Sequence, residues 1–208
     1  MRLRLRCVDD GQSKIDGGYA MASMMRWRSP AKINLHLRVG GPGPDGFHPL
    51  MSWMVTVGLF DKLSFEFEGW LDRSSVRLTS DDSAVPMDGS NLICRAIDIW
   101  RKNRAADAKK DPQRSNRGKL FRQHRLVGGH GWISVSLEKR IPSGGGLGGG
   151  SSNAATTLCV LESHFAKAGF PKLSHDELSK FGAELGSDVP FFFDAPSALS
   201  SGRGEKIV

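Results

Sequence analysis

Residues 142–152 hold six glycines in eleven positions, and this segment constrains the fold more than any other part of the sequence. An alternating strand pattern over residues 133–137 leads into it, and an amphipathic helix pattern over residues 154–168 follows it. A flexible linker would not be expected between a strand and a helix that follow it so directly. Because glycine has no Cβ, the backbone N–H groups of this loop can turn inward toward a bulky ligand. The following helix adds free N–H donors and a positive dipole end, so the segment predicts an anion site, most naturally for phosphates.

Two common phosphate motifs do not fit this loop. The Walker pattern requires Gly-Lys-Ser/Thr at its end, whereas Gly150 is followed directly by serine. Gly144, Gly146 and Gly149 have the spacing of the dinucleotide-binding fingerprint. The acidic residue that should end a later strand is here Glu162, which lies inside the helix pattern. We therefore reject both motifs.

The remaining periodicity predicts an α+β fold, with a mixed sheet and packed helices. Residues 33–39 alternate as a strand, which is expected to place Lys32, Asn34, His36 and Arg38 on one face. The other predicted strands cover residues 51–60, 63–67, 133–137 and 191–193. The other predicted helices cover residues 91–103 and 174–186, the second beginning with a Ser-x-x-Glu capping box.

Residues 1–28 are predicted to form a disordered N-terminal extension, with order beginning near Pro30. The arginines at its start alternate with leucines, as in a transit peptide, but three aspartates argue against one. A simple extension, or a start codon assigned too early, is the preferred interpretation.

The net charge of +7 comes from one segment and not from the fold as a whole. Residues 101–125 carry ten lysines and arginines against two aspartates, so the rest of the chain has a net charge of −1. We interpret residues 101–131 as a solvated basic insertion. The alternative is an arm that binds nucleic acid or an acidic partner, and its single aromatic residue makes nucleic acid the weaker choice.

Composition excludes several other classes of protein. No run of 18 apolar residues occurs, so no membrane span is predicted. Three cysteines are too few for a disulfide scaffold, and none lies in a Cys-x-x-Cys pair. None of the six histidines forms His-Glu-x-x-His, and no metal ligands are predicted. A reducing, cytoplasmic location fits the cysteine content. The oligomeric state is left open.

The glycine-rich segment, with Asn153 and Ala154 after it, resembles the central phosphate loop of the GHMP kinases. Residues 29–35, 45–50 and 186–192 resemble, in order and spacing, the branch of this family that acts on a cytidine diphosphate-linked methylerythritol. The resemblance implies a GHMP-kinase N-terminal nucleotide-binding domain over residues 29–208. It also implies that the family's second lobe is absent here or only begun, so the chain is expected to be a C-terminally truncated form.

This resemblance implies a reaction. ATP, accompanied by Mg²⁺, would transfer its γ-phosphoryl group to a hydroxyl of 4-(cytidine 5'-diphospho)-2-C-methyl-D-erythritol, in the non-mevalonate route to isoprenoid precursors. Lys32 and Asp188 match the family's catalytic pair. Asp188 would orient the hydroxyl and accept its proton, and a loose transition state asks mainly for position and charge compensation. Lys32 would keep Asp188 ionised and offset the charge of the transferring group.

The same resemblance assigns the binding residues. His48 and Phe47 would recognise the cytosine end by hydrogen bonding and stacking, although Phe47 stands where a tyrosine is expected. Asn34 is either a substrate contact or an ordinary strand residue. The expected ATP-binding residues are Pro142, Ser143, Gly144, Gly145, Gly146, Leu147, Gly148, Gly149, Gly150, Ser151 and Ser152.

Two other functions remain open at this stage. One is a GHMP kinase for another small alcohol, such as mevalonate or homoserine. The other is a non-catalytic protein that binds a polyanion through the basic insertion. If the second lobe is missing, the chain would keep the phosphate loop and the catalytic pair but lack a closed active site.

Overall fold

The computed structural model describes residues 24–44, 46, 48–68, 75–110, 132–167, 171–202 and 204–207. The predicted extension up to residue 23, residues 111–131 of the basic insertion, and Phe47 lie outside the described residues. Within the described part of the chain, no helix combines the length and the hydropathy that crossing a membrane requires.

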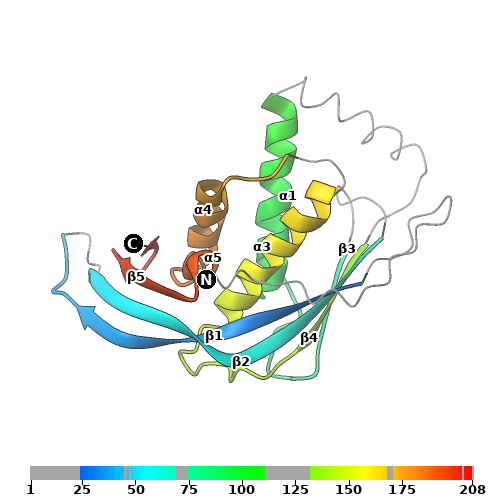
Figure 1. The fold of residues 1–208 in the computed structure, drawn as a ribbon. Helices are drawn as coiled ribbons and strands as arrows, with labels where there is room; N and C mark the ends of the chain where they lie inside the picture. The colour runs from blue at the N-terminus through cyan, green and yellow to red at the C-terminus, as the bar shows by residue number, and fades with distance from the viewer. Residues whose placement is uncertain are drawn as a thin grey trace.

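A six-stranded sheet carries all the described helices on one face (Figure 1). The strands are β1 (Met25–Val39), β2 (Leu50–Glu68), β3 (Ser75–Ser80), β4 (Trp132–Glu138), β5 (Ser197–Ser201) and β6 (Lys206–Ile207). The helices are α1 (Leu92–Lys110), α3 (Gly149–Lys167), α4 (His175–Leu185) and α5 (Phe191–Asp194). Strands β3 and β4 run parallel, while the other strand pairs in the described residues run antiparallel, so the sheet is mixed, as predicted.

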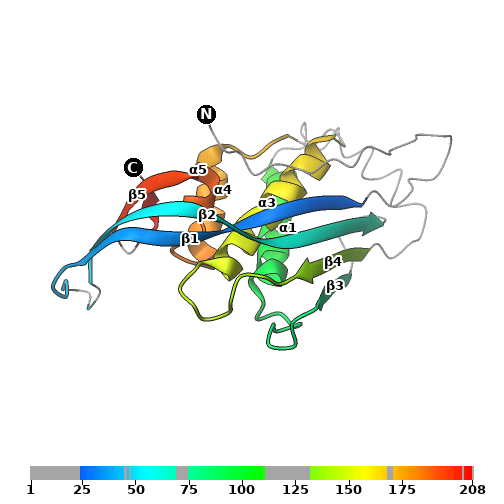
Figure 2. The same cartoon turned by 60° about the horizontal axis from the view of Figure 1, so that its bottom comes forward.

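Strand β2 organises the sheet because other strands pair with both of its edges (Figure 2). One edge of β2 pairs with β1, while the other edge pairs with β5 near its start and with β4 near its end. The prediction of two separate strands, 51–60 and 63–67, is therefore wrong. The pairing of Ser29 with Asp61 and of Arg28 with Lys62 carries the strand through residues 61 and 62, where the prediction placed a break.

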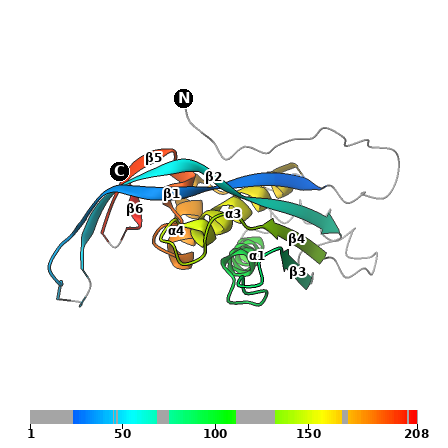
Figure 3. The ribbon, with the colours of Figure 1, turned by 90° about the horizontal axis from the view of Figure 1, so that it is seen from below.

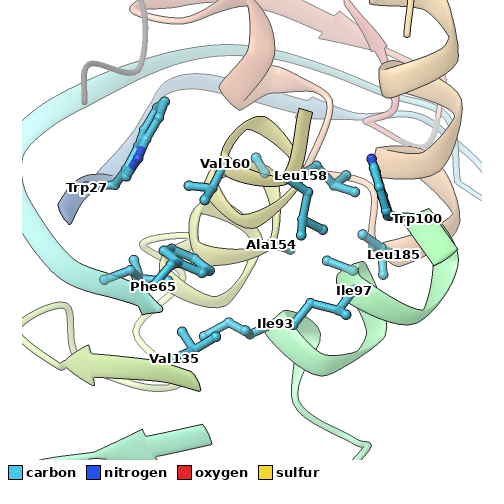
Figure 4. Packing of buried hydrophobic residues seen from close by; sticks show 14 of the residues in the cluster. Trp27, Phe65, Ile93, Ile97, Trp100, Val135, Ala154, Leu158, Val160 and Leu185 are labelled. Atoms are coloured by element: carbon cyan, nitrogen blue, oxygen red, sulfur yellow. The ribbon is translucent and has the colours of Figure 1, made fainter. Parts of the chain in front are cut away.

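The core lies between the sheet and helices α1 and α3. Figure 4 shows Phe65 and Val135 of the sheet facing Ile93 and Ile97 of α1, with Leu158 of α3 beside them. All five side chains are buried, and burial of this kind is the main source of folding free energy.

Strand β1 begins at Met25, four residues before the predicted boundary of the ordered chain. Met25 and Trp27 are both buried and belong to the core cluster. The prediction that residues 25–28 are disordered is therefore wrong, because alternate side chains here point into the core.

A β-bulge in β1 changes which side chains share a face. Asn34 pairs with Met54 and His36 pairs with Trp53, so Leu35 is an extra residue without a partner. Since directly opposed residues lie on the same face, His36 is rotated to the face opposite Asn34. The predicted common face of Lys32, Asn34, His36 and Arg38 is therefore wrong beyond Asn34.

Residues 191–193, predicted as a strand, form the helical turn α5 instead. Pro190 has helical backbone angles, with φ −57° and ψ −35°, and starts the turn. Phe191 and Phe192 are buried in the core cluster. A short apolar run fits either a buried strand or a buried helical turn, so its pattern alone could not decide.

The first ten residues of the predicted basic insertion continue helix α1. Glu162 of α3 explains why this helix is held: its carboxylate accepts from Trp100 Nε1 at 2.5 Å and pairs with Arg104 at 2.6 Å. It also accepts from the backbone N–H of Leu173 at 2.7 Å. Glu162 is 7% exposed, so this charge is satisfied entirely by protein groups that join α1, α3 and the start of α4.

We expect Glu162→Gln to lower the free energy of unfolding by about 3 kcal/mol, because it leaves the cation of Arg104 buried without a counter-charge. Urea unfolding followed by circular dichroism measures the change. Lys62 pairs with Glu138 at 3.0 Å, and both side chains are about half exposed. Lys62→Met is the control and should change stability by less than about 1 kcal/mol. Equal effects of the two substitutions would contradict the structural role of Glu162.

His164 gives the fold a specific dependence on pH. Its ring stacks on Phe67 with 4.0 Å between centroids. Burial, assisted by nearby Lys167, lowers the pKa of His164 below its ordinary value of 6.5. The unfolded chain therefore binds this proton at higher pH than the folded chain, and stability is lost as pH falls below that value. We expect acidification from about pH 7 to about pH 5 to destabilise the wild-type chain more than His164→Gln. Parallel urea titrations would contradict this if both chains responded equally.

Candidate active site

The glycine-rich loop connects β4 to α3 and lies directly against strand β1. Three of its glycines, Gly144, Gly146 and Gly148, have φ angles of 76°, 69° and 70°, in the left-handed region that favours glycine. The backbone N–H of Lys32 donates to the carbonyl of Leu147 at 2.9 Å. A Cβ on Gly148 would lie 2.9 Å from Cγ of Lys32, so glycine is needed here for close approach as well as for φ.

The loop forms one wall of a pocket with a volume of about 390 Å³, within the usual range for small-molecule sites. The N-terminus of α3 opens into the pocket through Gly149, Gly150 and Ser151. Its free N–H groups and its dipole favour an anion at this point. The structure therefore places ten of the eleven predicted ATP-binding residues, 142–151, along one cavity.

The opposite wall of the pocket was missed by sequence reasoning. It consists of residues 84–86 and 90–92, which lie between β3 and α1. Asn91 caps α1, since its Oδ1 accepts from the N–H of Ile93 at 2.9 Å. The helix start was visible in the sequence, but its proximity to the glycine loop follows from the parallel pairing of β3 with β4, for which the sequence offered no signal.

Ser152 departs from the predicted set. Its hydroxyl accepts a hydrogen bond from Ser29 Oγ at 2.7 Å, and its side chain is fully buried away from the pocket. Ser152 therefore ties the start of α3 to β1, and Ser151 is the serine that faces the cavity. The sequence showed two adjacent serines at the start of a helix, but it did not indicate which of them lines the cavity.

Lys32 and Asp188 meet beside the glycine loop. Lys32 Nζ lies 3.2 Å from Asp188 Oδ2, with the lysine side chain 7% exposed and the aspartate side chain 33% exposed. Asp188 follows Gly186, the C-cap of α4, in a turn closed by a hydrogen bond from the N–H of Val189 to the Gly186 carbonyl. Sequence positions 156 residues apart are thus brought into contact, as the resemblance implied.

Asn34 holds Lys32 from the other side. Lys32 Nζ donates to Asn34 Oδ1 at 2.7 Å, and Asn34 Nδ2 donates to Ser52 Oγ at 2.6 Å. Ser52 Oγ in turn donates to the carbonyl of His36 at 2.9 Å. This chain of donors fixes the amide of Asn34 with its oxygen toward the ammonium. Asn34 is therefore placed to position Lys32, whether or not it also contacts a substrate.

His48 is not brought to this pair. It lies in the connection between β1 and β2, where its Nδ1 is 2.9 Å from the carbonyl of Gly40. Figure 3 shows this connection at the end of an arm that extends past the helices. Gly40 is eight residues beyond Lys32, roughly 20 Å or more along the strand.

Lys139 and Arg140, which flank the loop, have different surroundings. Arg140 is exposed and pairs with Asp81 at 2.9 Å. Lys139 is buried and pairs with Asp61 of β2 at 2.8 Å. Among the described residues, no three histidines, cysteines or acidic residues gather as a metal cluster.

Comparison with known proteins agrees with this geometry. The GHMP kinases N terminal domain matches residues 117–198 of the chain. The crystal structure of a 4-(cytidine 5'-diphospho)-2C-methyl-D-erythritol kinase superposes with a TM-score of 0.62 at 30% identity, covering 88% of this chain and 54% of that one. The fold of the chain is that of a GHMP kinase N-terminal domain. The mixed sheet, the packed helices and the loop before α3 are the features of this fold that the sequence predicted.

Two curated relatives are both named 4-diphosphocytidyl-2-C-methyl-D-erythritol kinase. The chloroplastic protein of Oryza sativa subsp. japonica is 36% identical over 177 residues, which are 85% of this chain and 37% of the rice protein. The protein of Shewanella oneidensis is 38% identical over 181 residues, which are 87% of this chain and 53% of the bacterial protein. The chain thus spans about half, or less, of the length of the relatives it matches.

We expect Gly148→Ala to lower the free energy of unfolding by about 2 kcal/mol, because it combines a left-handed backbone with a close approach to Lys32. Gly145→Ala is the matched control, since its Cβ would meet its nearest atom at 3.6 Å and its φ is not in that region. It should change stability by less than about 0.5 kcal/mol. Thermal and urea unfolding measure both, and equal losses would show that the loop is not packed tightly on β1.

Proposed function

We propose that this chain forms the ATP-binding lobe of a kinase that phosphorylates a hydroxyl of 4-(cytidine 5'-diphospho)-2-C-methyl-D-erythritol. The observation that carries the proposal is the contact of Lys32 with Asp188, at 3.2 Å, next to the glycine loop and the N-terminus of α3. The relatives named for this activity, at 36% and 38% identity, support the choice of substrate.

In the proposed mechanism the triphosphate lies along residues 142–151, where loop N–H groups and the α3 dipole compensate its charge. The nucleoside extends toward residues 84–92, across the pocket. The γ-phosphoryl group then faces Lys32, whose buried ammonium offsets the negative charge that spreads over its oxygens.

Asp188 acts on the acceptor. Its side chain is one third exposed, so a hydroxyl can reach it, while its other contact is the ammonium of Lys32. In this role Asp188 orients the hydroxyl toward the phosphorus and takes its proton as the phosphoryl group transfers. Asn34 contributes indirectly, because it fixes the position of the Lys32 ammonium.

Mg²⁺ is compatible with the residues present. This ion commonly keeps several water ligands and uses one or two protein ligands together with substrate phosphates, so a dense acidic cluster is not required. Ser151 lines the pocket, and its hydroxyl is the group we assign to the ion. The ion would neutralise charge on the phosphates that the loop holds.

The cytidine end of the substrate is assigned to His48 and Phe47, by the resemblance alone. The substrate has a ribose and a diphosphate between its cytosine and its acceptor hydroxyl, so this assignment places the two ends of the substrate at separate points of the site. The non-mevalonate pathway and a cytoplasmic location belong to the same proposal. The rice relative is named chloroplastic, whereas the name of the bacterial relative gives no location.

The polyanion-binding alternative loses support in the described part of the basic segment. Arg104 stacks on Trp100, with its guanidinium carbon 5.3 Å from the ring centroid, and pairs with buried Glu162. A side chain committed to the core in this way cannot also present its charge to RNA.

We expect the chain to bind ATP, and a version that also carries the family's second lobe to release ADP when supplied with Mg²⁺ and the cytidine diphosphate alcohol. Asp188→Asn should leave ATP binding intact and lower turnover by about 100-fold or more, because the hydroxyl loses its proton acceptor. Asp176→Asn is the control, since this aspartate is 92% exposed at the start of α4. Calorimetry measures binding, and a coupled ADP assay measures turnover.

Three outcomes would contradict this proposal. A chain that binds no ATP is not the proposed lobe. Normal turnover in Asp188→Asn would remove Asp188 from the mechanism. Faster turnover with mevalonate or homoserine than with the cytidine diphosphate alcohol would assign the domain to a different GHMP substrate.

A further inference from the structure

Asp61 is a fully buried carboxylate in the middle of strand β2, outside every motif that the sequence indicated. Aspartate is disfavoured in strands, and a buried carboxylate costs several kcal/mol unless donors satisfy it. Its presence here therefore calls for a specific set of partners.

Four donors surround this carboxylate, and all four belong to the two ends of the glycine loop. Oδ1 accepts from the backbone N–H groups of Arg140 and Ile141, each at 2.8 Å. Oδ2 accepts from Lys139 Nζ at 2.8 Å and from Asn153 Nδ2 at 3.0 Å. One side chain thus joins the residues that enter the loop to the first turn of the helix that leaves it.

The charge of Asp61 is balanced at the same place. The Lys139 side chain is 8% exposed, and its ammonium also donates to the carbonyl of Ile141. The pair is therefore neutral as a unit, so the aspartate does not repel an anion from the pocket that Lys139 lines. The N–H groups of residues 143–151 are not used by this pair.

We propose that Asp61 is a positioning residue. From strand β2 it holds the two ends of the glycine loop together and so preorganises the loop. This inference rests on the proposed function, because the ligand of the loop is taken to be ATP. A loop already held in its binding shape loses less conformational entropy when it binds, so the contribution of Asp61 appears in nucleotide affinity.

Asp61→Asn tests the inference with little change in volume. The new amide can still accept from Arg140 and Ile141, but its NH₂ group would face two donors, the ammonium of Lys139 and the amide of Asn153. We expect amide hydrogen exchange in residues 143–150 of the ligand-free chain to speed up by about tenfold or more, and ATP to bind about tenfold more weakly.

Glu162→Gln is the matched control. Glu162 is the other buried carboxylate with several donors in the described residues, but its partners lie on α1, α3 and before α4, away from the loop. It should lose stability without changing exchange in the loop or the affinity for ATP. Asn153→Ala is a milder second variant, which removes one donor, and it should speed up loop exchange by about twofold to fivefold if Asp61→Asn does not fold.

The two measurements separate the possible failures. If wild-type chain binds no ATP while Asp61→Asn still speeds up loop exchange, the proposed function is wrong and the positioning role stands. If Asp61→Asn or Asn153→Ala exchanges its loop amides like wild type, the positioning role is overturned. It is overturned as well if Glu162→Gln changes the loop as much as Asp61→Asn does.

Discussion

The close packing of the glycine loop on strand β1 is the constraint on which the site depends. The loop has to approach the backbone of Lys32 closely enough for a 2.9 Å hydrogen bond from its N–H to the Leu147 carbonyl. That approach leaves no room for a side chain at position 148. The same contact sets the ammonium of Lys32 beside the start of α3, where an anion is favoured. The packing of the glycine loop on β1 therefore positions both the ammonium of Lys32 and the backbone N–H groups that are proposed to bind phosphate.

Two buried carboxylates hold helix α3, which follows the loop, at its two ends. Asp61 reaches up from the sheet to the ends of the loop, and Glu162 joins the far part of α3 to α1 and to the segment before α4. Each is satisfied by at least three donors, so each acts as a geometric tie instead of a loose ion pair. Helix α3 is thereby fixed at both ends, and its N-terminus cannot shift relative to the pocket without breaking charged hydrogen bonds.

Local signals predicted much of this arrangement. Glycine content, helical period and the capping box located the loop and helices α3 and α4, and the resemblance to GHMP kinases brought Lys32 to Asp188. The failures share a physical cause, since each depended on three-dimensional neighbours. The three phenylalanines before Asp194 became a helical turn because tertiary packing decided between two fits. Strand pairing, which a single sequence does not reveal, decides three of the missed features. They are the contact of Ser152 with β1, the pocket wall at residues 84–86 and 90–92, and the partners of Asp61.

The bulge at Leu35 has a consequence for the arm formed by the ends of β1 and β2. Beyond it, apolar side chains no longer sort to one face: Leu37 shares a face with Ser52, while Trp53 lies on the opposite face beside His36. Leu37, Val39, Met51 and Trp53 are all exposed. Hydrophobic side chains are therefore exposed to solvent on both faces of the arm. Its cohesion comes from the ladder of main-chain hydrogen bonds and its sideways pairing with β5, and the hydrophobic core contributes little to keeping it straight.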